Sequence, residues 1–303
     1  MQIKDYFFKK KLTTSFEFFP PRTQKASDNL FETIKKLVPL KPTYVSVTYG
    51  AGGTTRELTN DLVIKLHKET KLTVVPHLTC VGSTRTDIEK IIQNYQDHGI
   101  QNIMILRGDK PKNEIIDLLK NDFLHAVDLV RFIKKIYPQM GIGVAGFPEG
   151  HPECTNRLLE IDYLKEKVDA GVDYICTQLF FDNKDYFDYI ERCQLAGINI
   201  PIIPGVMPIT SLSNLKRMAD LAQGVRFPAK LLKSVIRTSN DSQVFDVGIH
   251  WASEQASGLL NNNVPGIHFY TLNKYESIIQ ICKTLGISTL DELTKEKLLS
   301  DKF

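Results

Sequence analysis

Residues 73–106 read TVVPHLTCVGSTRTDIEKIIQNYQDHGIQNIMIL, and this stretch indicates the fold of the chain. It begins and ends with short apolar runs, TVVPHL at 73–78 and NIMIL at 102–106, and between them the apolar residues recur with helical spacing. Both runs are too uniformly apolar for a sheet with one face in water, so we expect parallel strands with both faces covered. The stretch is therefore predicted to be a strand, a helix and a second, parallel strand.

The same alternation recurs along the rest of the chain. Six further runs are predicted as strands: TTSFEF (13–18), TYVSVT (43–48), GIGVAGF (141–147), VDYICTQLF (172–180), IPIIPG (200–205) and GIHFYTL (266–272). We expect the eight strands to end near Glu17, Thr48, His77, Leu106, Phe147, Gln178, Gly205 and Tyr270. Five of the seven intervals are 27 to 31 residues long, which is close to one βα unit.

Eight βα units favour a closed (β/α)8 TIM barrel, an α/β fold, over an open doubly wound sheet, which usually has fewer strands. The longest interval, 205–270, predicts extra helices between strands 7 and 8, at 226–236 and 243–260. No linker rich in Gly, Ser or Pro divides the chain, so we expect residues 1–303 to form a single domain.

The composition favours a small-molecule ligand. A formal net charge of +3 over 303 residues is too small to indicate a nucleic acid or an anionic membrane as partner. No run approaches the roughly 18 apolar residues of a membrane helix. Five cysteines, an odd number without a Cys-x-x-Cys pair, indicate free thiols in a reducing compartment. We therefore expect a cytoplasmic protein.

Polar side chains stand at the expected strand ends, where a (β/α)8 barrel carries its active site. Glu17, Thr48, His77, Arg107 and Gln178 would converge on one mouth. In strand one, alternation places Phe16 and Phe18 on one face and Glu17 on the other. Desolvation of an inward carboxylate is expected to raise the pKa of Glu17 and suit it to donate a proton near neutral pH. The alternative is a structural ion pair.

Two further patterns carry less information. The loop GAGGTT at 50–55 could approach a phosphate or a flat ring, but a dinucleotide fingerprint would need glycine where Thr55 stands. The pairs His77/Cys80 and His151/Cys154 could indicate a zinc site. Residues three apart in extended chain point to opposite faces, so no metal is expected.

Nine segments in order resemble the methylenetetrahydrofolate reductase family over about residues 13–285. They are SFEFFPPRT (15–23), VSVTYGAGGTTRELT (45–59), PHLTC (76–80), LRGD (106–109), GFPEGHPE (146–153), KVDAG (167–171), TQLFFD (177–182), IPGVMPI (203–209) and HFYTLN (268–273). The resemblance implies a (β/α)8 barrel that binds FAD without a Rossmann domain. The length is similar to the short forms that consist of the catalytic barrel alone.

The resemblance also implies a reaction, the reduction of 5,10-methylenetetrahydrofolate to 5-methyltetrahydrofolate in one-carbon and methionine metabolism. Hydride would pass from NADH or NADPH to FAD and then to the folate. Glu17 matches the general acid of the family, and Asp109 matches the acid between flavin and pterin. Gln178, Asn214 and Lys274 match positions that contact the folate. A homo-oligomer is common in the family.

The positions that match FAD contacts are Thr48, Tyr49, His77, Arg107, Gly108, Asp109, His125, Ala126, Ala145, Phe147, His151, Glu160, Tyr163 and Lys167. Arg107 and Lys167 would supply the cations that two phosphates need. The chain departs from the family pattern at His125, Phe147, Glu160, Tyr163, Asn214 and Met218. The sequence leaves three classes of function open. They are a flavin reductase, a zinc-dependent hydrolase and a barrel that only binds folate or a partner.

Overall fold

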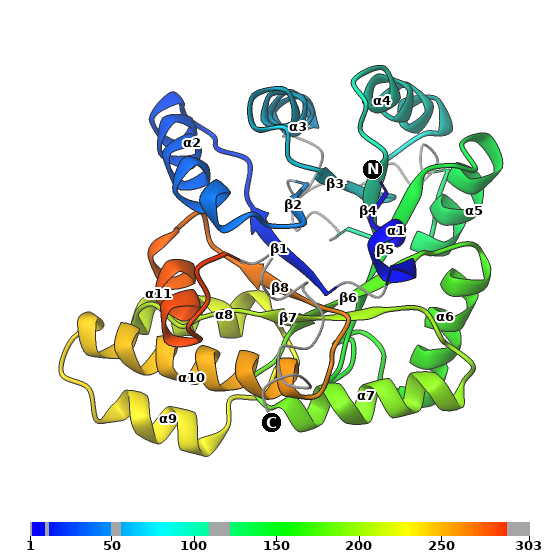
Figure 1. Cartoon of the computed structure of the whole chain (residues 1–303). Coiled ribbons are helices and arrows are strands. Elements are labelled where there is room, and N and C mark those ends of the chain that lie inside the picture. The colour runs from blue at the N-terminus through cyan, green and yellow to red at the C-terminus, as the bar shows by residue number, and fades with distance from the viewer. Residues whose placement is uncertain (1, 10–11, 50–55, 109–121, 290–303) are drawn as a thin grey trace.

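Eight parallel strands close into a barrel in the order β1 to β8, with helices around it (Figure 1). The structure, a computed structural model, describes residues 2–9, 12–49, 56–108 and 122–289. The strands are β1 (Thr13–Phe18), β2 (Tyr44–Val47), β3 (Val74–Thr79), β4 (Asn102–Leu106), β5 (Gly141–Gly146), β6 (Tyr174–Leu179), β7 (Ile202–Val206) and β8 (Gly266–Tyr270). The predicted (β/α)8 barrel is confirmed, and each strand ends within two residues of its expected end.

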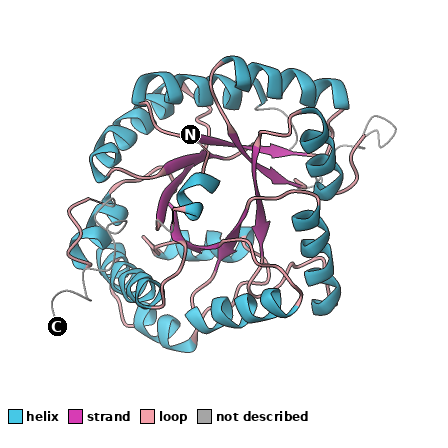
Figure 2. Cartoon of the chain, turned by 45° about the vertical axis from the view of Figure 1, so that its right-hand side comes forward, coloured by secondary structure: helices cyan, strands magenta, loops and turns pink. Residues whose placement is uncertain are grey.

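Helices connect consecutive strands on the outside of the ring, as the view along the barrel shows (Figure 2). The helices around the ring are α2 (Gln24–Leu37), the 3-10 turn η1 (Val38–Leu40), α3 (Arg56–Thr70), α4 (Arg85–Asp97), α5 (Ala126–Ile136), α6 (Arg157–Asp169), α7 (Asn183–Leu195), α8 (Leu212–Leu221), α9 (Ala229–Ile236), α10 (Asp241–Asn261) and, after β8, α11 (Glu276–Thr284). The short helix α1 (Lys4–Phe8) precedes β1 and lies at one end of the barrel. The extra helices predicted between strands 7 and 8 are α9 and α10, which follow α8. No described helix is both long and apolar enough to cross a membrane.

Helix α4 illustrates how the sequence sets these connections. Thr84 caps it, because the Thr84 hydroxyl accepts from the Asp87 N–H while the Asp87 carboxylate accepts from the Thr84 N–H. Ile88, Ile92 and Tyr95 then recur on one face and are buried against the strands. Side-chain caps also begin five other helices, α2, α6, α7, α8 and α10, where the side chain of the N-cap residue accepts from a backbone N–H of the first turn.

The core has an outer and an inner part, because side chains of a strand alternate between the two faces. Phe16 and Phe18 of β1 belong to the large outer cluster between strands and helices. A smaller inner cluster fills the barrel: Ile3, Tyr44, Val75, Met104, Tyr174, Cys176 and Ile203.

The N-terminal segment covers the amino end of the barrel. The Ile3 N–H donates to Asn102 Oδ1 at 2.9 Å, and the Phe7 ring lies 6.0 Å from the Tyr174 ring, centroid to centroid. Apolar side chains therefore fill this end of the barrel. The polar residues predicted at the strand ends lie at the opposite, carboxyl end.

Glycine in β7 makes room for a ring at that carboxyl end. A Cβ at Gly205 would lie 2.6 Å from the Tyr270 ring and 2.5 Å from the Thr177 carbonyl oxygen. The Tyr270 hydroxyl donates to that same carbonyl at 2.8 Å. The Tyr270 side chain of β8 thus reaches across β7 to β6. Its ring narrows the interior of the barrel below the mouth.

Candidate active site

Glu17 lies inside the barrel near the carboxyl ends of the strands, with 6% of its surface exposed. Its Oε2 atom is 3.4 Å from His77 Nε2 on β3 and 3.4 Å from His268 Nε2 on β8. Ser46 of β2 is the register neighbour of Glu17 and faces it from the adjacent strand. One carboxyl and two imidazoles from separate strands are therefore concentrated in one buried space.

His268 was not predicted as a site residue, although the motif HFYTLN contains it. The His268 ring is 2% exposed, and its Nδ1 lies 2.7 Å from the Ser15 hydroxyl. Strand alternation could have found it, because His268 is two residues before Tyr270 and shares the inner face. The register of the closed barrel, which pairs Ser15 with His268, could not be read from the sequence.

The expected rise in the pKa of Glu17 is wrong for this structure. Burial raises the pKa of the Glu17 carboxyl. The His268 hydrogen bond and the charges of His77 and His268 together lower this pKa by more, so it lies below its ordinary value. Burial also lowers the pKa of His77. The flanking phenylalanines that suggested an apolar site point outwards, and the inner neighbours of Glu17 are polar.

The turn after β8 joins the two strands that close the barrel. The Thr271 hydroxyl donates to the Glu17 carbonyl at 2.6 Å, and the Asn273 side chain pairs with both backbone groups of Phe19. Leu272 and Asn273 have φ of 52° and 58°, a conformation that is costly for a side chain such as leucine. Lys274, a predicted substrate contact, follows this turn and is exposed.

The two predicted cations lie on different elements, Arg107 after β4 and Lys167 in the last turn of α6. Arg107, just after β4, pairs with Glu153 at 2.7 Å. Lys167 on α6 is partly buried and makes no hydrogen bond or ion pair with any residue that the structure describes. Burial lowers the pKa of Lys167 to about 8, although the charge of Glu160 raises it. An ammonium that is desolvated without a partner suits an anionic ligand.

The loop after β5 brings three predicted cofactor contacts together. The Phe147 ring packs edge-on against the His151 ring at 4.7 Å between centroids. The His151 N–H donates to Glu160 Oε1 at 2.7 Å, which ties this loop to α6. Ala145, one residue from the end of β5, is partly exposed and carries a small side chain.

Gly108 is required by the backbone after β4. Its φ is +84°, and an added Cβ would lie 2.9 Å from Thr79 Cβ. Gly108 therefore lets the chain turn next to Thr79, where any other residue would clash. Asp109 and the loop 50–55 lie outside the described residues.

The remaining predicted cofactor positions are spread more widely. The Thr48 N–H donates to the Phe18 carbonyl and Tyr49 is buried, so both lie where β2 ends. His125 precedes Ala126 at the start of α5, and its side chain is 72% exposed. Tyr163 on α6 is 51% exposed. His125 and Tyr163 thus lie at the surface, outside the buried cluster.

The predicted substrate contacts differ in their surroundings. Gln178 Oε1 accepts from the Leu179 N–H, and no described residue hydrogen-bonds its amide nitrogen. Asn214 Oδ1 accepts from the Thr210 N–H and supports the start of α8. Met218 is 1% exposed in an apolar cluster with Leu215 and Leu231, so it packs inside the protein.

The two His-x-x-Cys pairs do not form one cluster. His77 faces Glu17, whereas Cys80 Sγ donates to the Arg107 carbonyl and Cys154 Sγ donates to the Asn156 carbonyl. All five cysteines are free thiols. Within the described ranges no three His, Cys, Asp or Glu side chains are grouped to hold a metal ion.

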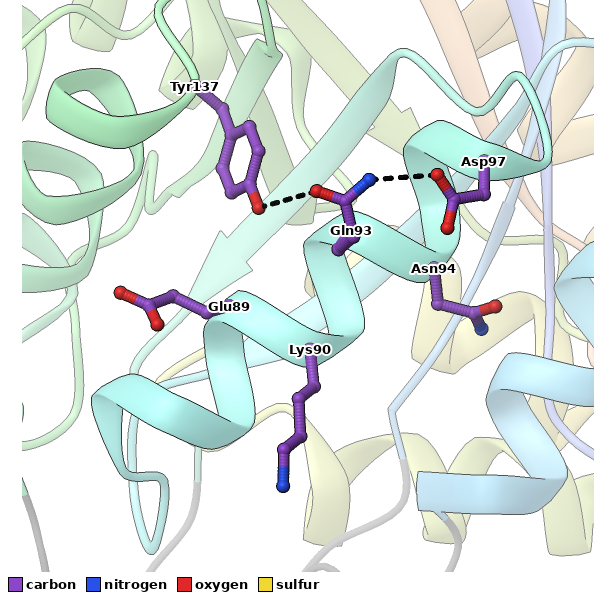
Figure 3. Close-up of a pocket in the computed structure, with 6 residues that line it drawn as sticks. All are labelled: Glu89, Lys90, Gln93, Asn94, Asp97 and Tyr137. Carbon is purple, nitrogen blue, oxygen red and sulfur yellow. Dashed lines mark hydrogen bonds between the residues drawn. The ribbon is translucent and has the colours of Figure 1, made fainter.

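A hollow on the outer surface is unrelated to the mouth (Figure 3). Glu89, Lys90, Gln93, Asn94 and Asp97 of α4 line it together with Tyr137. The Tyr137 hydroxyl donates to Gln93, and Gln93 donates to Asp97. The hollow lies toward the ends of α4 and α5, on the side of the barrel where the next strands begin, so it is not a candidate active site.

Comparison with known proteins agrees with the motifs. A family model described as methylenetetrahydrofolate reductase matches residues 2–286. The 5,10-methylenetetrahydrofolate reductase of Salmonella typhimurium is 37% identical over 91% of this chain and 92% of that protein. Methylenetetrahydrofolate reductase (NADH) 1 of Arabidopsis thaliana is 37% identical over 90% of this chain, which spans 48% of the plant protein.

Among solved structures, an uncharacterized protein from Clostridium thermocellum, described as binding two copies of 5-methyl-5,6,7,8-tetrahydrofolic acid, superposes with a TM-score of 0.64. It is 14% identical, with 94% of this chain and 99% of that chain covered, which supports the fold. The match of the family model over nearly the whole chain, together with relatives that are 37% identical, decides the family. The chain belongs to the methylenetetrahydrofolate reductase family.

Proposed function

We propose that this chain binds FAD and reduces 5,10-methylenetetrahydrofolate to 5-methyltetrahydrofolate, using NADH or NADPH. The observation that carries the proposal is the buried cluster of Glu17, His77 and His268 at the carboxyl end of a family barrel. A proton donor buried beside a ligand space is what opening of the folate ring requires.

The described residues fit FAD. Lys167, an ammonium without a described partner, and Arg107, whose partner Glu153 is 59% exposed and can move away, would bind the two phosphates. A flat cofactor needs a place where it can approach the backbone, room beside it and a ring to pack against. Gly108 offers the first, the small Ala145 the second and Phe147 the third. When bound, FAD supplies hydride transfer between the nicotinamide and the folate.

The other cofactor positions are proposed from the family motifs. They are Thr48, Tyr49, His77, Asp109, His125, Ala126, His151, Glu160 and Tyr163. For the folate, Gln178 would use its amide group on the pterin, and the exposed Lys274 would meet the anionic glutamate end. Asp109 is proposed to support the cationic intermediate. Asn214, in the first turn of α8, is proposed to contact the folate too.

Glu17 is proposed as the general acid, although its pKa is lowered in the ligand-free site. A bound folate would exclude water from the mouth, and a low dielectric favours a neutral acid and neutral imidazoles over separated charges. The proton would then lie on the Glu17 carboxyl, from which it passes to the folate nitrogen that leaves as the five-membered ring opens. His77 and His268 would keep that carboxyl in place.

Purification and reduction test this function. We expect a yellow protein, or one that becomes yellow with added FAD, whose flavin absorbance bleaches with NADH or NADPH in the absence of oxygen. Addition of methylenetetrahydrofolate should restore the absorbance and yield 5-methyltetrahydrofolate. A colourless protein with stoichiometric zinc that cannot take up FAD would contradict the proposal and favour the hydrolase. A protein that binds folate but never oxidises the reduced flavin would favour the binding barrel.

We further propose a cytoplasmic homo-oligomer whose single barrel domain spans residues 1–303 and whose partners are the folate and the nicotinamide. Rates with each nicotinamide identify the donor, and light scattering gives the subunit number.

A further inference from the structure

We propose that His268, held by Ser15, is the residue that positions Glu17 for proton transfer. This inference rests on the proposed function, because it assigns a role to the acid of that reaction. His268 would act through Glu17 and would not itself exchange a proton with the folate.

The geometry fixes the His268 ring on two sides. Ser15 of β1 and His268 of β8 are register neighbours, with Ser15 Oγ 2.7 Å from His268 Nδ1. On the other side of the ring, Nε2 faces Glu17 Oε2 at 3.4 Å. The Tyr270 ring packs edge-on against it at 5.0 Å, centroid to centroid. A ring that is 2% exposed and has both nitrogens engaged is well oriented.

The Ser15 contact fits either tautomer of His268, and the Glu17 carboxylate, which only accepts hydrogen bonds, favours the one with its proton on Nε2. When the Ser15 hydroxyl donates to Nδ1, the neutral ring carries its proton on Nε2, which then donates to the Glu17 carboxylate. Because this Nε2 already carries a proton, it cannot take one from Glu17. A proton that Glu17 gains on ligand binding therefore stays available to the folate.

His77 differs from His268 in this respect. It contacts the same oxygen of Glu17 at 3.4 Å, but no described residue hydrogen-bonds its second ring nitrogen. Within the described ranges, His268 on β8 thus has a second side-chain contact, with Ser15, whereas the contact given for His77 on β3 is the one with Glu17.

The other titratable groups near Glu17 are neutral and leave this role to the imidazoles. They are Tyr44 of β2, Cys176 of β6 and Tyr270 of β8, and burial raises the pKa of each above its ordinary value. The two imidazoles have the larger effect in lowering the pKa of Glu17, and the Ser46 hydroxyl adds a smaller one.

Two substitutions of His268 separate its two contacts. In His268→Asn the amide nitrogen replaces Nδ1, which keeps the contact with Ser15 and loses the one with Glu17. In His268→Gln the amide nitrogen replaces Nε2 and keeps the contact with Glu17. Thermal melting and FAD retention of both variants serve as the control for folding.

We expect His268→Asn to lower the rate of flavin reoxidation by methylenetetrahydrofolate about 10-fold to 100-fold, because the acid is no longer held in place. In the pH–rate profile of this variant, the fall in rate at alkaline pH should move to higher pH, since a contact that lowers the pKa of Glu17 is lost. His268→Gln should recover part of the rate and keep this fall near that of the wild type. Equal losses in both variants, with no shift in the pH of this fall, would overturn the proposal.

A second measurement does not depend on the reaction. Nitrogen-15 NMR of histidine-labelled protein should show His268 protonated on Nε2 in the wild type and a mixture of tautomers in Ser15→Ala. Carbon-13 NMR of labelled glutamate should show the pKa of Glu17 rising in His268→Asn and less so in His268→Gln. A His268 ring protonated only on Nδ1, or a Glu17 pKa that is the same in His268→Asn as in the wild type, would overturn the proposal. This holds even if the wild type proved not to reduce methylenetetrahydrofolate.

Discussion

At the scale of single residues, Glu17 is the group whose role is most directly testable, because only one of the two half-reactions needs an acid. In Glu17→Gln the flavin should still be reduced by the nicotinamide at nearly the wild-type rate. Reoxidation by methylenetetrahydrofolate should fall by at least about 10²-fold to 10⁴-fold, since an amide cannot donate a useful proton. Anaerobic stopped-flow measurement of the flavin absorbance follows both steps.

The competing interpretation of Glu17 as a structural ion-pair partner predicts a different result. Loss of one member of a buried cluster would lower the thermal stability and weaken FAD retention, so both half-reactions would fall alike. Equal effects on the two rates, or no effect on either, would remove Glu17 from the mechanism.

Lys167 provides a second test at this scale through the pH dependence of cofactor binding. Its pKa of about 8 means that the ammonium of the free protein loses its proton as the pH rises through 8. An anion that pairs with this group should therefore bind more weakly at pH 9 than at pH 7. In Lys167→Met, FAD affinity at pH 7 should fall about 10-fold or more, and the decrease between pH 7 and pH 9 should shrink.

Quenching of flavin fluorescence measures these affinities. The matched control is Lys165→Met on the same helix, because Lys165 pairs with Asp169 one turn away and should leave FAD binding unchanged. If Lys167→Met retained the full pH dependence, another group would hold the phosphates.

The residues of the site show where sequence reasoning succeeded and where it stopped. Glu17, His77 and Gln178 were predicted because each stands at the end of an apolar run, a position that a (β/α)8 barrel gives to its active site. His268 lies two residues before a strand end, so a search of strand ends passed over it. The lowered pKa of Glu17 could not be predicted either, because it depends on a contact between β1 and β8, residues 251 apart.

At the scale of elements, helix α10 packs closely on the loop between β7 and α8, and its two glycines form a matched pair. A Cβ at Gly248 would lie 1.8 Å from the Ile209 carbonyl oxygen, in the loop between β7 and α8. At Gly258 the nearest atom is the end of the Asn183 side chain, at 2.8 Å. Backbone cannot move aside as a side chain can, so Gly248 fixes how near α10 lies to the mouth.

Gly248→Ala should therefore destabilise the protein by about 1–3 kcal/mol or more, despite the higher helix propensity of alanine. Gly258→Ala should be nearly neutral, since Asn183 can shift and alanine favours the helix by up to about 1 kcal/mol. Urea denaturation of both variants gives the two free energies of unfolding. Equal values would mean that α10 does not need this close approach.

The elements themselves were largely predictable, because period-2 and period-3.6 patterns are local. Strands and the helices α9 and α10 were found from apolar spacing alone. The closing contacts of α10 were not, since Gly248 gives no signal in a sequence until its partner in space is known. The N-terminal helix α1 was also missed, because a five-residue helix carries too few apolar residues to show a period.

At the scale of the whole molecule, FAD binding should stabilise the barrel, because its proposed contacts join elements from β2 to α6. A ligand at 100 times its dissociation constant adds about 2.7 kcal/mol to the free energy of unfolding. For a chain of this size that raises the melting temperature by about 4–5 °C. Thermal melting of the flavin-free protein with and without FAD measures the shift.

The three classes of function predict different patterns in the same measurement. A flavin reductase should respond to FAD more strongly than to riboflavin, because riboflavin lacks the phosphates that Arg107 and Lys167 would bind. Zinc chloride should leave the melting temperature unchanged, whereas a zinc hydrolase would be stabilised by the metal and not by FAD. A barrel that only binds folate would be stabilised by folate alone. A shift with zinc or folate and none with FAD would contradict the cofactor proposed here, whatever the family of the chain.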